Sequence, residues 1–168
     1  MRVLISTASK HGSTTEIGRA IADVLTEEGI DARQIAPDDV VDLNGYDAVV
    51  LGSAVYAGRW MKAVNGLVER LAPELGGRPV WLFSSGPIGD PPKPEEDPVD
   101  VAPILEATGA RAHFLFAGKL EKKTLNFGER AMVAAFKAPE GDFRDWDEIR
   151  DRARGIAAEL KAMMSPLS

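Results

Sequence analysis

A short segment near the N-terminus combines hydroxyl, glycine and basic residues directly before a helical pattern. It consists of Ser9, Lys10, His11, Gly12, Ser13 and Thr14. Backbone amides in a first helical turn lack intrahelical partners and lie at the positive end of the helix dipole. Together with hydroxyls, and a glycine that permits close backbone approach, they form a pocket for an anion such as phosphate. An ordinary Ser/Thr helix cap is the alternative interpretation.

Two other phosphate-binding motifs are absent from the sequence. No G-x-x-x-x-G-K-[ST] pattern occurs, which argues against a loop for nucleoside triphosphates. No G-x-G-x-x-G pattern follows the first predicted strand, which argues against a dinucleotide-binding loop. The segment 9–14 comes directly after that strand, where parallel α/β sheets bind their ligands. We therefore favour a mononucleotide phosphate over a plain helix cap.

Two further segments are rich in small and hydroxyl residues and also follow predicted strands. Residues 53–60 would let the backbone approach a flat ligand, on which Tyr56 or Trp60 could stack. Tyr56 is the better candidate, because Trp60 could equally begin a helix and pack in the core. Residues 84–90 are either a plain loop or a source of free amides for the polar edge of a ring. The candidate binding residues in these segments are Ala54, Val55, Tyr56, Ala57, Gly58, Ser84, Ser85, Gly86, Pro87, Ile88 and Gly89.

Apolar runs of strand length alternate with helical patterns along the chain. Strands are predicted over residues 2–5, 32–35, 47–52, 78–83 and 111–117, and helices over 14–28, 60–71, 99–107 and 145–164. This alternation predicts a doubly wound α/β fold with a parallel sheet, in which the weak strand 32–35 lies at an edge. The link 36–46 is a poor helix or a plain loop. The proline-rich and acidic residues 86–98 are expected to form a long surface loop.

The composition is typical of one globular domain spanning residues 1–168. Hydrophobic residues make up 45% and charged residues 27%. Because the chain has no cysteine, disulfides, thiolate metal sites and a cysteine nucleophile are excluded. The net charge of −6 and the lack of a basic stripe argue against a nucleic-acid partner. We expect no transmembrane segment and no signal peptide, and therefore a cytoplasmic protein.

Other residues with chemical potential are predicted to be structural. Trp81 lies within a strand and is expected in the core, and His113 is expected to be a hydrogen-bonded or edge residue. The carboxylates of residues 95–97 do not have the spacing of a metal site. His11 is expected to contact a ligand through its backbone. No side chain is assigned as catalytic, since neither histidine has an identifiable acidic partner.

From Val3 to Ile21 the sequence resembles the FMN-phosphate signature of flavodoxins, with S-x-x-G-x-T at Ser9, Gly12 and Thr14. Thr7 stands where that signature prefers an aromatic residue, and Gly18 where it prefers alanine. The chain also resembles flavodoxin-domain proteins related to menaquinone-dependent protoporphyrinogen dehydrogenase, through residues 52–60 and 141–147. The resemblance implies a flavodoxin-like sheet of five parallel strands in the order 2-1-3-4-5, with helices on both faces.

The same resemblance implies an FMN-dependent two-electron oxidoreductase that uses a quinone or oxidises a tetrapyrrole. Loop amides near residues 84–89 would stabilise the reduced flavin N1. The alternatives are a flavodoxin that only carries electrons to a redox protein partner, and a binding or regulatory module without flavin. Residues 118–140 match an extra segment of that family. This segment could pack on the core, meet a partner chain or contact a membrane surface; the sequence leaves the oligomeric state open.

Overall fold

The computed structural model describes residues 1–9, 12–56, 59–85, 101–116, 119–120, 141–142 and 144–164. The strands are β1 (Arg2–Ala8), β2 (Asp31–Gln34), β3 (Ala48–Tyr56), β4 (Arg59–Trp60), β5 (Val80–Ser85), β6 (Ala112–Phe116), β7 (Lys119–Leu120) and β8 (Gly141–Asp142). The helices are α1 (Ser13–Glu27), the 3₁₀ helix η1 (Pro37–Asp39), α2 (Lys62–Gly76), α3 (Ala102–Thr108) and α5 (Trp146–Met164). Strands and helices alternate, as the sequence predicts.

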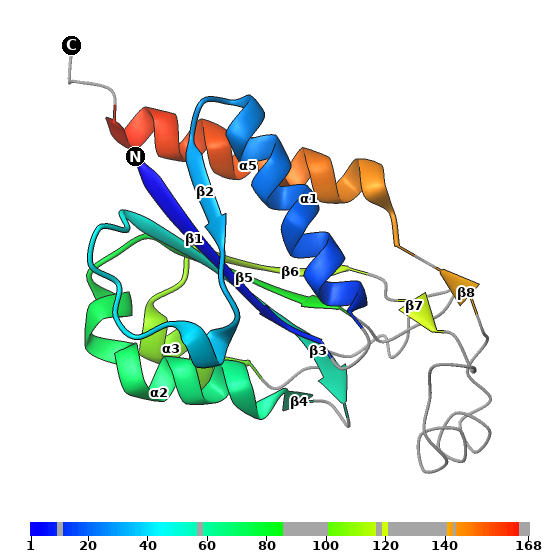
Figure 1. The fold of residues 1–168 in the computed structure, drawn as a ribbon, viewed down its shortest axis with the longest axis horizontal. Coiled ribbons are helices and arrows are strands. Elements are labelled where there is room, and N and C mark those ends of the chain that lie inside the picture. The colour runs from blue at the N-terminus through cyan, green and yellow to red at the C-terminus, as the bar shows by residue number, and fades with distance from the viewer. Residues whose placement is uncertain are drawn as a thin grey trace.

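Five parallel strands form the central sheet in the order β2-β1-β3-β5-β6 (Figure 1). This order confirms the predicted parallel sheet and the edge position of its second strand. The order reverses between β1 and β3, which is where sheets of this type bind ligands. At that end of the sheet Ala8 pairs with Ser53, and Ala54 pairs with Ser85. The three predicted binding segments therefore begin at adjacent strand ends.

Two helical layers cover the sheet. Figure 1 shows α1 and α5 on one face, and α2 and α3 on the other. Trp81 and Phe83 point from β5 into the first layer and are fully buried, so the prediction that Trp81 is a core residue is confirmed. Alternate residues of the same strand, such as Leu82, pack into the second layer. Burial on both faces explains why the central strands are continuous apolar runs.

Several predicted boundaries were wrong for identifiable reasons. β1 and β3 continue past residues 5 and 52, because their ladder carries on through hydroxyl and small residues after the apolar runs end. The helix predicted from residue 60 starts at Lys62, and residues 59–60 instead form β4, antiparallel to β3. That helix also continues to Gly76. Its backbone leaves helical geometry at Leu71 (φ −116°, ψ 16°), two residues before Pro73, whose ring disfavours the regular helix.

The link between β2 and β3 contains only one short helical element, η1. Arginines from elsewhere in the fold bind its carbonyl groups. The Arg70 guanidinium donates to Val40 O at 2.8 Å and to Pro37 O at 3.0 Å, and Arg78 Nε donates to Tyr46 O at 2.8 Å. These bonds satisfy backbone acceptors that a regular helix would have paired internally.

The two short strands at the ends of the extra segment 118–140 are paired with each other. β7 and β8 pair in antiparallel fashion, with Lys119 opposite Asp142 and Leu120 opposite Gly141. Figure 1 shows this pair beyond the end of the sheet from which α1 begins. The interior of the segment, residues 121–140, and the predicted loop 86–98 lie outside the described residues. None of the described helices is long and apolar enough to cross a membrane.

Candidate functional site at the start of helix α1

The turn between β1 and α1 is the first candidate site, and the structure describes its residues 9 and 12–14. Gly12 is left-handed, with φ +87°, a conformation that glycine adopts without strain. Its carbonyl accepts the first helical hydrogen bond, from Glu16 N at 3.1 Å. Ser9 Oγ accepts a hydrogen bond from Thr14 N at 3.3 Å. The serine side chain thus folds back toward the amides of the first turn, which is compatible with both the anion pocket and the plain helix cap; Lys10 and His11 lie outside the described residues.

Thr14 carries an unsatisfied hydroxyl inside this turn. Its side chain is 0% exposed, and no described residue offers its Oγ1 a hydrogen-bond partner. A buried polar group left in this way costs about 1–3 kcal/mol. Such groups in native proteins commonly await a ligand or an ordered water. A phosphate oxygen, which accepts from hydroxyls and amides together, fits this position chemically.

The residues beneath the turn form a polar support. Thr7 Oγ1 donates to Thr15 Oγ1 at 3.4 Å, and Gln34 Nε2 donates to Thr15 O at 3.0 Å and to Thr7 Oγ1 at 3.4 Å. A Cβ on Gly18 would lie 2.6 Å from Gln34 Nε2 and 2.8 Å from Thr7 Cγ2. The two departures from the flavodoxin signature, Thr7 and Gly18, are therefore neighbours where α1 packs on β1.

The second candidate segment is mostly strand rather than loop. Ala54 is buried, Val55 is half-buried, and both belong to β3 together with Tyr56. Trp60 is 4% exposed and packs in the core, which confirms the core interpretation for that residue. The side chain of Tyr56, with Ala57 and Gly58, lies outside what the structure describes. Stacking by Tyr56 therefore stays a prediction.

The third candidate segment starts inside the sheet. Ser84 and Ser85 are buried at the end of β5, and Ser84 Oγ accepts a hydrogen bond from Trp60 Nε1 at 2.7 Å. The same oxygen lies 2.7 Å from His113 Nε2 on the edge strand β6. This confirms that His113 is a hydrogen-bonded edge residue. The remaining candidates, Gly86, Pro87, Ile88 and Gly89, lie outside the described residues.

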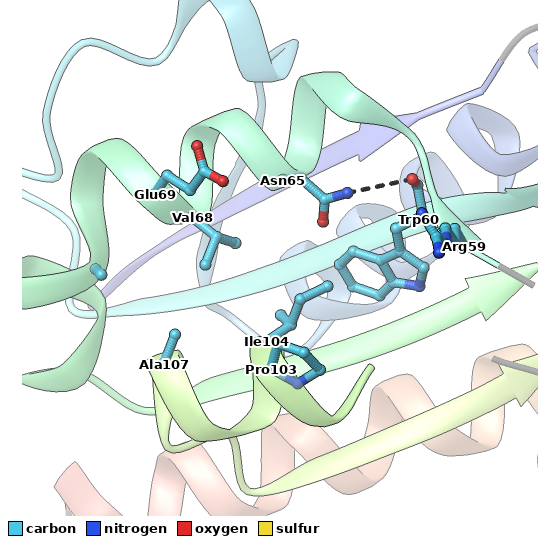
Figure 2. A pocket seen from close by; sticks show the side chains of 9 residues that line it. Arg59, Trp60, Asn65, Val68, Glu69, Pro103, Ile104 and Ala107 are labelled. Atoms are coloured by element: carbon cyan, nitrogen blue, oxygen red, sulfur yellow. Dashed lines mark hydrogen bonds between the residues drawn. The ribbon is translucent and has the colours of Figure 1, made fainter. Parts of the chain in front are cut away.

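Two features of this region could not be predicted from the sequence. One is Arg144, whose guanidinium reaches the carbonyl of Ser13 from a distant part of the chain. The other is a pocket of about 540 Å³ between α2 and α3 (Figure 2). It is lined mainly by apolar side chains, with polar groups among them: Arg59, Trp60, Asn65, Val68, Glu69, Ala72, Pro103, Ile104 and Ala107. Both depend on tertiary contacts, and no sequence motif predicts them.

The comparisons with known proteins identify the family. The model of the flavodoxin domain matches residues 4–147, and the chain belongs to this family. Membership implies a flavin-binding electron-transfer protein. No curated protein sequence matches the chain.

Solved structures show the same fold at low sequence identity. A flavodoxin from the domain Archaea aligns over 96% of this chain and 99% of its own, with 18% identity and a TM-score of 0.67. Flavodoxin 1 from Bacillus cereus aligns over 98% and 100%, with 19% identity and a TM-score of 0.61. Rubredoxin oxygen:oxidoreductase from Desulfovibrio gigas aligns over 98% of this chain but only 37% of its own, with 15% identity and a TM-score of 0.66. The chain thus matches one part of that larger enzyme.

Proposed function

We propose that this protein binds FMN through its phosphate at the start of α1 and transfers electrons through the bound flavin. The observation that carries the proposal is the buried hydroxyl of Thr14, for which the described part of the chain provides no acceptor. The residues proposed to hold the phosphate are Ser9, Lys10, His11, Gly12, Ser13 and Thr14. Those proposed to face the isoalloxazine ring are residues 54–58 and 84–89.

The protein's contribution is placement and electrostatics. Amides of the first turn of α1, at the positive end of the helix, would bind phosphate oxygens together with the hydroxyl of Thr14. Ala54 and Ser85 pair in adjacent strands, so a ring held between their following segments would lie beside the phosphate turn. Bound FMN supplies reversible electron transfer. No described side chain is assigned as an acid or base.

Spectroscopy of the purified protein tests the proposal directly. We expect flavin absorption bands, release of FMN on denaturation, and the mass of FMN in the released material. The protein stripped of ligand should quench FMN fluorescence on titration with one site per chain. A colourless protein that also fails to bind added FMN would refute the proposal and favour a module that uses the fold without flavin.

As the redox substrate bound in the pocket of Figure 2 we propose a quinone that accepts electrons, or a tetrapyrrole that is oxidised, in preference to a redox protein partner. The pocket is predominantly apolar, as a quinone or tetrapyrrole requires. It is lined by Trp60, whose indole is hydrogen-bonded to Ser84 at the strand end proposed to face the flavin. In Figure 2, α2 contributes Asn65 and Val68 to one side of the pocket, and α3 contributes Ile104 to the other.

Reduced protein mixed with menadione or with cytochrome c separates these two classes of acceptor. Ala107 is exposed and lines the pocket, so Ala107→Trp should fill the pocket with little effect on folding. We expect this variant to raise the KM for menadione and to leave cytochrome c reduction unchanged. Ala102→Trp, on the same helix outside the pocket, is the control. Equal menadione kinetics in both variants would exclude the pocket and favour a protein acceptor.

A further inference from the structure

We propose that Asn65 makes the pocket between α2 and α3 selective for flat, apolar ligands that carry a hydrogen-bond donor. This inference rests on the proposed function, which assigns the redox substrate to the same pocket. Asn65 lies in the first turn of α2, lines the pocket and is half-buried. Its Nδ2 donates to Trp60 O at 3.2 Å, as Figure 2 shows.

The hydrogen bond to Trp60 fixes the orientation of the Asn65 amide. A carbonyl oxygen only accepts, so the amide nitrogen must face Trp60 O and the amide oxygen must face away from it. In Figure 2 this oxygen points toward the side of the pocket to which α3 contributes Ile104. No residue in the described part of the chain donates to Asn65 Oδ1. Asn65 therefore presents a fixed acceptor to a ligand in the pocket.

The other polar groups that line the pocket are already paired or exposed to water. Trp60 Nε1 donates to Ser84 Oγ at 2.7 Å inside the protein, so its single N–H is not available to a ligand. Arg59 and Glu69 also line the pocket, but both are exposed. Interactions of exposed charged groups contribute little, because water competes for them. Selectivity is therefore expected mainly from Asn65.

An acceptor in this position distinguishes ligands of similar shape by their donors. A ligand hydroxyl can donate to Asn65 Oδ1, whereas a carbonyl or ether oxygen would place a second acceptor against it. A hydroquinone carries hydroxyls where its quinone carries carbonyls, so the pocket should bind the reduced form of a quinone more tightly. A tenfold preference would raise the midpoint potential of the bound two-electron couple by about 30 mV.

Two naphthalenes of similar shape test this selectivity on the FMN-loaded protein. 1-Naphthol carries the hydroxyl donor, and 1-methoxynaphthalene does not; isothermal titration calorimetry gives the Kd of each. We expect Asn65→Leu to weaken 1-naphthol binding by about threefold to tenfold, as the loss of one neutral hydrogen bond implies. The same variant should bind 1-methoxynaphthalene equally well or more tightly. If Asn65 only holds Trp60 in place, both ligands should lose affinity equally.

Two further variants locate the binding site and its acceptor. Ala107→Trp fills the pocket and should weaken both naphthalenes. Glu69→Leu, one turn further along α2, removes the exposed carboxylate that also lines the pocket. It should leave the ratio of the two affinities as in the wild type. A ratio that changes in Glu69→Leu and not in Asn65→Leu would make the carboxylate the acceptor and overturn the proposal.

The outcomes separate this inference from the proposed function. A loss of 1-naphthol preference in Asn65→Leu, with an unchanged ratio in Glu69→Leu, supports the inference. An unchanged ratio in Asn65→Leu, equal losses for both ligands, or binding that Ala107→Trp does not affect overturns it. If Asn65→Leu does not fold, Asn65→Ala is measured by the same ratio. Failure of the wild type to bind FMN overturns the proposed function, whereas an FMN-binding protein without the preference overturns only this inference.

Discussion

Replacing Thr14 by valine should make the ligand-free protein more stable and the FMN complex weaker. The hydroxyl of Thr14 is fully buried, and no partner for it exists among the described residues. Valine has a similar shape and removes a polar atom whose burial costs about 1–3 kcal/mol. We therefore expect the free energy of unfolding of the ligand-free protein to rise by about 1 kcal/mol. The gain should be visible as a higher urea midpoint with an unchanged m-value.

The same substitution removes a donor to the phosphate. A hydrogen bond to a charged group contributes about 1.5–3 kcal/mol, which corresponds to a loss of FMN affinity of about 10- to 150-fold. Thr108 provides the matched control. It is equally buried, but its Oγ1 donates to Ile104 O at 2.7 Å. Thr108→Val should therefore destabilise the protein by about 0.5–1.5 kcal/mol and leave FMN binding unchanged.

The prediction requires that Thr14→Val raises the free energy of unfolding of the ligand-free protein and that Thr108→Val lowers it. If Thr14→Val destabilises the ligand-free protein as Thr108→Val does, the Thr14 hydroxyl is satisfied without ligand, and the reasoning from its burial is wrong. If FMN affinity does not change in a fluorescence titration, the phosphate binds elsewhere.

Two further predictions concern stability. Gly52→Ala would place a Cβ 2.1 Å from Phe83 Cζ on the adjacent strand, where the ring is fully buried, and should cost about 1–3 kcal/mol or more in urea unfolding. The double variant Gly52→Ala/Phe83→Leu should lose less stability than the sum of the two single variants. If the two losses in free energy of unfolding simply add, the Phe83 ring is not the obstacle. The hydrogen bond from Arg2 lowers the pKa of Asp31 below its usual 3.8, so its contribution exists above that pH and is lost as the pH falls through the lowered value. Urea midpoints of wild type and Asp31→Asn should therefore differ near neutral pH and converge only as the pH falls below 3.8 and through the lowered pKa, and a gap independent of pH would contradict this assignment.

The sheet and the turn between β1 and α1 were predictable because their causes are local. Buried strands such as β5 are continuous apolar runs, and the spacing of Ser9, Gly12 and Thr14 follows from the geometry of a first helical turn. β4 was missed because Trp60 fits a helical period as well as a strand. The Trp60 indole is hydrogen-bonded to Ser84, which is 24 residues away in sequence. Side-chain contacts across the fold leave no periodic signal, so the contact of Arg144 with Ser13 O could not be predicted from the sequence.

The departures from the flavodoxin signature at Thr7 and Gly18 are best understood as one change rather than two. The Gln34 side chain crosses from the edge strand β2 and binds both Thr7 Oγ1 and Thr15 O. Its amide occupies the space that a methyl group on residue 18 would need, since an added Cβ would lie 2.6 Å from Nε2. A bulkier residue at position 7 would compete for the same space, because Thr7 Cγ2 already lies 2.8 Å from that Cβ position. Glycine at 18 and a small hydroxyl residue at 7 thus accompany Gln34 as one polar support below α1.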